Sequence, residues 1–282
     1  MRYRVKGQRH FDTTQLPANE RRGLVGHWVG GGSGYTWFDR SGRRNHGTLT
    51  SGPTWNLGVE GIRNAVSFDG TNDYVLINDS DSLDLASMTI CAWVYLTSYP
   101  ADTKEAAIVS KGGTGETAGN NHNYLLTIEN NLFNTGLAVV ATFLYENSSG
   151  TNYTTYFDLT ADNFPLNTWH HVLGVFDDTA DTMDVYIDGV QGVAGTGKTG
   201  TPENNAQNVR IGYGNVGANS VYFPGKIDDV RIYNRALSKA EIVKIAKGTY
   251  NLVLPHSKRS YKNPAATATG VASMTGVGSL TL

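Results

Sequence analysis

Two adjacent aspartates, Asp228 and Asp229, stand inside a segment that otherwise has the composition of a β-strand, FPGKIDDVRIYNR. Strands are depleted in aspartate, so these two carboxylates are the first candidates for chemistry. Side chains alternate along a strand, which predicts Asp228 on one face with Val230 and Ile232, and Asp229 outside beside Arg231. If the apolar face is buried, Asp228 must be paired with a cation, bound to a metal or hydrogen-bonded, because an isolated buried charge is too costly.

The sequence lacks the paired carboxylates that glycoside hydrolases use. Those enzymes need two acids on one face, about 5 Å apart when they retain configuration, and no alternating acid pattern occurs along one expected strand. The nearest acids, Glu129 and Glu146, each stand alone at a strand end, where we predict a turn or surface role. His170 and His171 are adjacent and should face opposite sides of a strand. The histidines show no zinc-like spacing, and we predict that the protein is not an enzyme.

Composition and turn signals predict an all-β fold. The chain of 282 residues has 33 glycines and 15 tyrosines, and only 17% of its residues are charged. About a dozen short strands, the first at 24–29 and the last at 225–233, indicate two stacked antiparallel sheets. The single cysteine, Cys91, lies in an apolar run and is predicted to be a small buried side chain. One helix should follow the last strand, with Ser238 and Glu241 as its capping box.

Charge is distributed unevenly along the chain. Residues 1–22 hold six Lys/Arg against two acids, and residues 248–282 hold three Lys/Arg and no acid, which leaves 14 basic and 23 acidic residues between them. We therefore predict a basic N-terminal arm at 1–22, a folded domain at 23–247 and a low-complexity C-terminal docking tail at 248–282. Basic arms can bind nucleic acid or an acidic protein surface. The acidic body lacks a basic groove with interleaved aromatic residues, so a protein partner is favoured over nucleic acid.

The sequence contains no apolar run long enough to span a membrane. Its first thirty residues also lack the apolar segment of a signal peptide. We expect a soluble protein that does not enter the classical export route.

Eight segments, taken in order, resemble one known family. They are GLVGHW, FDRSGRRNHGTL, AVSFDGTNDYVLI, MTICAWVYL, WHHVLGVFD, VYIDGV, VRIGYG and FPGKIDDVRIYNRALSKAEI. Together they resemble the laminin-G-like family of concanavalin A-like lectin and glucanase jelly rolls, over about Gly23 to Lys247. The resemblance implies an all-β, two-sheet antiparallel jelly-roll sandwich with one short C-terminal helix and extended N- and C-terminal arms. It does not by itself determine function.

The resemblance also implies a structural calcium ion. Related jelly rolls often hold calcium with an aspartate at the position of Asp228, aided by oxygens from an early loop, which is FDRSGRRNHG in this chain. Asp39, Asn45 and Asp228 are the predicted ligands, with other oxygens of the loop as candidates, because calcium takes about six to eight hard oxygen ligands. The alternative is a buried Asp228 that accepts backbone hydrogen bonds from the loop or pairs with Arg43 or Arg44.

Long polar loops at 103–121 and 190–208 favour a non-enzymatic binding or display module, because recognition usually lies on loops of a rigid scaffold. A fold suited to extracellular binding, without an export signal and with two basic arms, predicts a capsid decoration or fibre protein on the surface of a virus (phage) particle. Its tails would dock on other subunits of a large assembly, and its loops would bind glycans or cell-surface proteins. The alternatives are a calcium-stabilised carbohydrate-binding protein exported by a non-classical route, and a glycan hydrolase or lyase.

Overall fold

A computed structural model describes residues 16, 18–32, 34–59, 64–101, 104–112, 122–130, 139–216 and 219–248 of the chain. Residues 1–15 and 249–282 lie outside this part, so the two predicted arms and their boundaries stay predictions. The loop predicted at 103–121 is wrong for residues 104–111, which form a strand, and residues 113–121 lie outside the described residues.

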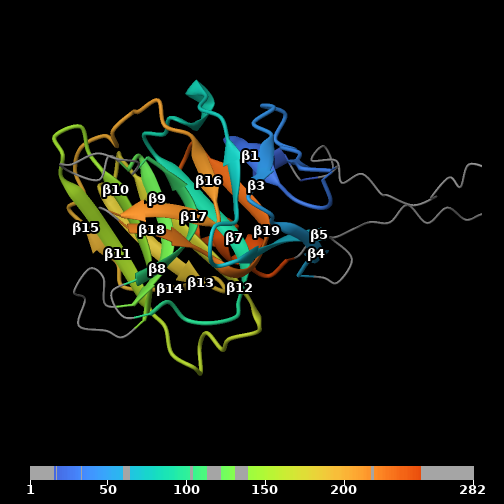
Figure 1. The fold of residues 1–282 in the computed structure, drawn as a ribbon. Helices are drawn as coiled ribbons and strands as arrows, with labels where there is room; N and C mark the ends of the chain where they lie inside the picture. The colour runs from blue at the N-terminus through green and yellow to red at the C-terminus, as the bar shows by residue number, and fades with distance from the viewer. Residues whose placement is uncertain are drawn as a thin grey trace, which may run out of the picture. The chain divides into compact units, whose positions relative to one another are not determined.

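Two antiparallel sheets make up the body of the protein (Figure 1). The strands of the first sheet are β1 (Leu24–Trp28), β4 (Thr54–Leu57), β5 (Asn64–Asp69), β7 (Met88–Leu96), β12 (Trp169–Asp177), β13 (Thr182–Ile187), β14 (Val190–Gln191), β15 (Gly195–Thr196) and β19 (Pro224–Tyr233). Its order is β14-β13-β12-β7-β19-β5-β4, with β1 paired to β19 and β15 paired to β13. This nine-stranded sheet is therefore centred on β7 and β19.

The second sheet has eight strands. They are β2 (Thr36–Trp37), β3 (Gly47–Thr50), β6 (Tyr74–Ile77), β8 (Lys104–Lys111), β9 (Tyr124–Asn130), β10 (Val140–Glu146), β11 (Asn152–Asp158) and β16 (Val209–Ile211). Their order is β11-β10-β9-β8-β16-β6-β3-β2. A separate hairpin of β17 (Tyr213–Val216) and β18 (Asn219–Tyr222) packs over β8.

The core lies between the inner faces of the two sheets. Ile90 and Val94 of β7 are fully buried in one apolar cluster with Leu126 of β9 and Phe143 of β10. Gly174 of β12 lies so close to the ring of Phe143 that a Cβ atom at this position would overlap it. Apolar side chains at every second position of β7 meet the opposite sheet in this way, as strand geometry requires. The predicted two-sheet antiparallel jelly-roll sandwich is confirmed.

The predicted C-terminal helix is present as α2 (Lys239–Ala246). Ser238 and Glu241 form the capping box, in which the Glu241 carboxylate accepts the backbone N–H of Ser238 at 2.9 Å. Ile242 and Ile245 are buried against the body, so the helix is a packing element. None of the helices among the described residues has the length and apolar character needed to cross a membrane.

A β-bulge in β19 overturns the side-chain alternation predicted for the two aspartates. Asp228 lies opposite Trp93 of β7 and Arg231 lies opposite Cys91, so β19 has one residue more than β7 between these pairs. Asp229 takes up the extra length with a left-handed backbone, φ 48°. Beyond the bulge the alternation is inverted, and Asp228 lies on the outer face of the sheet with Arg231 instead of sharing a face with Val230.

Asp229 pairs with Arg231, as the sequence suggested, but both side chains are buried, at 2% and 1% exposure. The Arg231 guanidinium donates to both carboxylate oxygens, at 3.0 and 2.9 Å. Nε2 of His27 in β1 lies 2.7 Å from Asp229 Oδ1. Glu20 of α1 (Ala18–Arg21) lies 3.8 Å from Arg231 and pairs with Lys244 of α2 at 2.7 Å. These pairs link both helices to the outer face of the nine-stranded sheet.

Lys111, at the end of β8, has a fully buried side chain inside a cage of oxygens. Its Nζ atom lies 2.6 Å from a carboxylate oxygen of Asp79 and 3.1 Å from one of Asp84. It also donates to the backbone carbonyls of Asn205 and Gln207, both at 2.8 Å. One ammonium group therefore joins the eight-stranded sheet to two separate loops.

We expect Lys111→Met to lower the free energy of unfolding by about 3 kcal/mol, because it leaves the carboxylates without their cation. This loss of stability is at the low end of the range for removing one partner of a buried ion pair. The reason is that the Asp79 side chain is 33% exposed and keeps some hydration. Urea unfolding of both proteins measures the difference. Lys239→Met, at an exposed position of α2, is the matched control and should change stability by less than about 0.5 kcal/mol. Equal stability of the two variants would refute the role given to Lys111.

Candidate functional site

The predicted metal loop, residues 38–47, is organised around the buried carboxylate of Asp39. Its Oδ1 accepts the backbone N–H of His27 at 2.9 Å and that of Ser41 at 2.7 Å. Its Oδ2 accepts the Ser41 hydroxyl at 2.8 Å and the backbone N–H of Asn45 at 2.9 Å. These four donors match the roughly four lone-pair positions of a carboxylate, so a metal ion at Asp39 would have to displace at least one of them.

Asn45 connects this loop to the residues around it. Its backbone carbonyl accepts the indole N–H of Trp28 at 2.8 Å. Its side-chain amide donates to the carbonyl of Val25 at 3.0 Å and to the hydroxyl of Ser82 at 2.9 Å. The structure thus brings two of the predicted ligands, Asp39 and Asn45, into direct hydrogen-bond contact.

The third predicted ligand, Asp228, is fully buried. Its Oδ1 accepts the backbone N–H of Asp229 at 2.7 Å, and its Oδ2 accepts that of Val59 at 3.3 Å. Within the part of the chain that the structure describes, no group of three or more His, Cys, Asp or Glu side chains is arranged to hold a metal ion. The calcium site of Asp39, Asn45 and Asp228 therefore stays a prediction.

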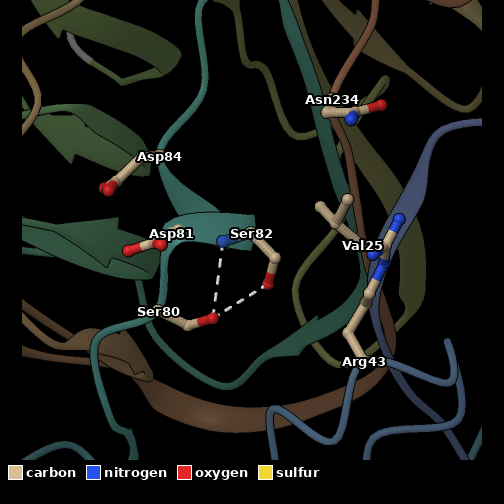
Figure 2. Close-up of a pocket in the computed structure, with 7 residues that line it drawn as sticks. All are labelled: Val25, Arg43, Ser80, Asp81, Ser82, Asp84 and Asn234. Carbon is tan, nitrogen blue, oxygen red and sulfur yellow. Dashed lines mark hydrogen bonds between the residues drawn. The ribbon is translucent and has the colours of Figure 1, made fainter.

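A pocket of about 520 Å³ opens beside this loop, next to the short 3₁₀ helix η2 (Asp81–Leu83) (Figure 2). Figure 2 shows the carboxylates of Asp81 and Asp84 on one side of the pocket and Val25 and Arg43 on the other. The lining residues are Val25, Arg43, Ser80, Asp81, Ser82, Asp84 and Asn234. The pocket is therefore bounded by the Asp39 loop, by η2 and by the turn that follows β19.

Hydroxyl and charged groups dominate the pocket wall formed by η2. The Ser80 hydroxyl accepts the backbone N–H of Ser82 at 3.4 Å and lies 3.0 Å from the Ser82 hydroxyl. These side chains thus stabilise the turn around η2 and also line the pocket. Asp81 and Arg43 are exposed there and can accept and donate hydrogen bonds to a polar ligand. The sequence did not reveal this pocket, because Arg43 and Asp81 meet only in the folded chain.

The prediction of a turn or surface role for Glu129 and Glu146 is wrong, because these side chains are 0% and 1% exposed. Glu129 of β9 lies directly opposite Glu105 of β8, which is 3% exposed. Burial, together with the charge of Glu129, raises the pKa of Glu105 to about 8. Inspection of single strands could not find this pair, because its two members belong to neighbouring strands.

His170 and His171 have structural partners. The ring of His170 stacks on Phe164 at 4.2 Å and lies 2.8 Å from the carboxylate of Asp188. The ring of His171 packs against the edge of Trp93 instead. The two rings thus have different neighbours, as the alternation of a strand predicts.

Known proteins share this fold. A laminin-G family model, described as the concanavalin A-like lectin/glucanases superfamily, matches residues 69–243, which is more than half of the chain. A search of curated protein sequences found no match.

Similar solved structures include the binding domain of Paraclostridial Mosquitocidal Protein 1, with a TM-score of 0.60 and 16% identity over 81% of this chain and 53% of that one. Another is the ligand binding domain of botulinum neurotoxin serotype D in complex with N-acetylneuraminic acid, with a TM-score of 0.61 and 14% identity over 81% of this chain and 52% of that one. The chain thus matches about half the length of each of these proteins. Identity at this level indicates a shared fold alone. From the family match and the confirmed jelly roll together, the chain belongs to the concanavalin A-like lectin/glucanase superfamily.

Proposed function

We propose that the protein is a non-enzymatic binding module that recognises a glycan in the pocket between Arg43 and Asp81. The pocket presents two carboxylates, two serine hydroxyls, an asparagine and a guanidinium, which suits a ligand rich in hydroxyl groups. The fold supports this proposal, since similar structures include binding domains, one of them solved with a bound sugar acid.

The chemistry of the pocket also predicts how strong this binding is. Its seven lining residues include no aromatic side chain, so a sugar ring would gain little apolar contact. We expect weak single-site binding, with a Kd on the order of 1 mM, and much stronger binding when several copies engage a displayed glycan.

A glycan array probed with a multivalent form of the protein tests this function. We expect the native chain to bind a subset of glycans. The binding signal of Asp81→Ala on these glycans should be at least tenfold lower. Asp162→Ala, an exposed aspartate that does not line the pocket, is the matched control and should bind like the native chain. No glycan binding by the native chain, or full binding by Asp81→Ala, would contradict the proposal.

We further propose that calcium stabilises the loop through Asp39, Asn45 and Asp228, as the family resemblance implies. The proposal is supported by the closeness of Asp39 and Asn45, since the backbone N–H of Asn45 donates to Asp39 Oδ2. Calcium would take the place of at least one of the four donors on Asp39. Calcium would be structural at this site, since it would join an early loop to the last strand.

Thermal unfolding in calcium and in a chelator tests this site. Calcium at about 100 times its Kd would raise the free energy of unfolding by about 2.7 kcal/mol. This corresponds to a rise in Tm of about 5–10 °C for a domain of this size. Asp228→Asn should reduce the rise, and the comparison of each variant with and without calcium removes the effect of the substitution on folding. If the Asp228→Asn protein keeps the full rise, calcium is not bound at Asp228.

A second candidate function is a decoration or fibre subunit on a virus particle. The two basic arms at 1–22 and 248–282, which flank an acidic body, favour this function, since such arms can dock on acidic neighbouring subunits. Within the described body, the ion pair between Glu20 and Lys244 brings the starting points of both arms close together.

Light scattering on the full chain and on a variant without residues 249–282 tests the assembly. The full chain should form or join a large particle, and the truncated chain should be released from it. A full-length variant with Lys258, Arg259 and Lys262 changed to Gln separates charge from length, and it should weaken assembly as well. A full chain that stays monomeric would eliminate this function.

A further inference from the structure

The buried glutamates Glu105 and Glu129 form an unusual pair on the outer face of the eight-stranded sheet. They are directly opposite each other in the antiparallel register of β8 and β9. Side chains at such positions leave the same face with their Cβ atoms about 5 Å apart. Two like charges at this distance repel each other, and burial removes the water that would screen them. The pair therefore requires a proton or a cation between its members.

Two threonine hydroxyls lie on the same face of the sheet. Thr127 lies two residues before Glu129 on β9, and Thr142 of β10 lies opposite Thr127. The Thr142 hydroxyl is 3.3 Å from Glu129 Oε1. Thr127 is close enough to Glu105 to favour its charged form, although burial and Glu129 outweigh that effect on the pKa. Two carboxylates and two hydroxyls thus form one cluster of hard oxygens.

The hairpin of β17 and β18 covers this cluster. A Cβ atom at Gly214 of β17 would lie 3.2 Å from Glu105 Oε1, so the backbone of the hairpin lies directly over the carboxylate. Val221 of β18 packs with Ala107 and Leu125 in a small apolar cluster that closes the cover. The same Cβ atom would lie 2.7 Å from the Cβ atom of Ala107, so only a glycine lets the hairpin approach the sheet this closely.

Glu105 is the independent sign that a ligand belongs in this place. Neither of its buried carboxylate oxygens has a hydrogen bond of good geometry among the described residues, and no lysine or arginine in the described part of the chain forms an ion pair with it. Buried polar groups in folded proteins are almost always satisfied. With nothing bound, Glu105 would be a buried carboxylate without hydrogen bonds next to a second carboxylate, which is energetically unfavourable.

We propose that a hard divalent cation, calcium in the first instance, binds between Glu105 and Glu129 beneath the hairpin, with the hydroxyls of Thr127 and Thr142 as neutral ligands. A cation satisfies the buried oxygens of Glu105 and offsets the repulsion between the two carboxylates. Oxygen donors of this type are those that calcium prefers, and water and backbone oxygens can complete its coordination. This site is separate from the predicted ligands Asp39, Asn45 and Asp228.

The cation would act as a clamp between sheet and hairpin. Without it, the pair keeps one proton, which Glu105 would hold at neutral pH. Burial is the largest cause that raises the pKa of Glu105, and the charge of Glu129 is the second. Cation binding must release that proton, so affinity should rise as the pH passes through about 8.

The test is calorimetric titration of the full chain with calcium chloride, and separately with manganese chloride, at pH 6.5 and pH 9. We expect binding at least tenfold tighter at pH 9. In the Asp228→Asn background, which removes the predicted loop site, Glu105→Gln should bind at least tenfold more weakly at that pH. Glu105→Gln should fold without difficulty, because glutamine keeps the shape of the side chain and is neutral, as protonated Glu105 is.

Asp228→Asn separates this site from the predicted loop site. Calcium binding that persists in Asp228→Asn and is lost when Glu105→Gln is added to Asp228→Asn supports the clamp. Binding lost in Asp228→Asn and kept in Glu105→Gln assigns calcium to the loop and overturns the proposal. The proposal is also overturned if neither metal binds the native chain at pH 9, since Glu105 and Glu129 would then share a proton only.

Discussion

The bulge at Asp229 in the central strand β19 is the constraint on which the buried charges of the nine-stranded sheet depend. Burial is the largest effect and disfavours the charged guanidinium, but Asp229 together with Tyr233 and Cys91 outweighs it and holds the pKa of Arg231 above its ordinary value. Burial also lowers the pKa of His27 despite its bond to Asp229, so the imidazole is neutral at pH 7. The ion pair between Asp229 and Arg231 exists only because the bulge at Asp229 turns both side chains to the same, covered face of the sheet.

Two groups of buried charges, around Arg231 and around Glu105, lie on the outer faces of the sheets, where a second layer covers them. The core between the sheets is formed by apolar side chains such as Ile90, Val94 and Phe143. On one outer face, helix α2 and residues near Glu20 cover Arg231. On the other, the β17–β18 hairpin covers Glu105. Each covered face can hold charge because specific partners, or in our proposal a cation, compensate for the lost water.

Much of the fold could be predicted from the sequence, because local signals agree with the tertiary structure. The capping box of Ser238 and Glu241 marks the start of α2, and the alternation of apolar residues in β7 follows the burial that the structure shows. The error at Asp228 came from applying strict alternation through a strand that contains an extra residue. Nothing local distinguishes Asp229 as the residue with positive φ, since the bulge is set by how β19 pairs with β7.

The candidate sites show the same division. The sequence by itself determined the all-β class, the helix, the uneven charge and the loop around Asp39, because each depends on residues close together along the chain. Only the tertiary structure decided that Arg43 faces Asp81 across a pocket and that Glu105 lies opposite Glu129. Alternation states which residues of one strand share a face, but the register between strands depends on long-range packing and turn geometry. Which carboxylates meet is therefore a property of the folded chain.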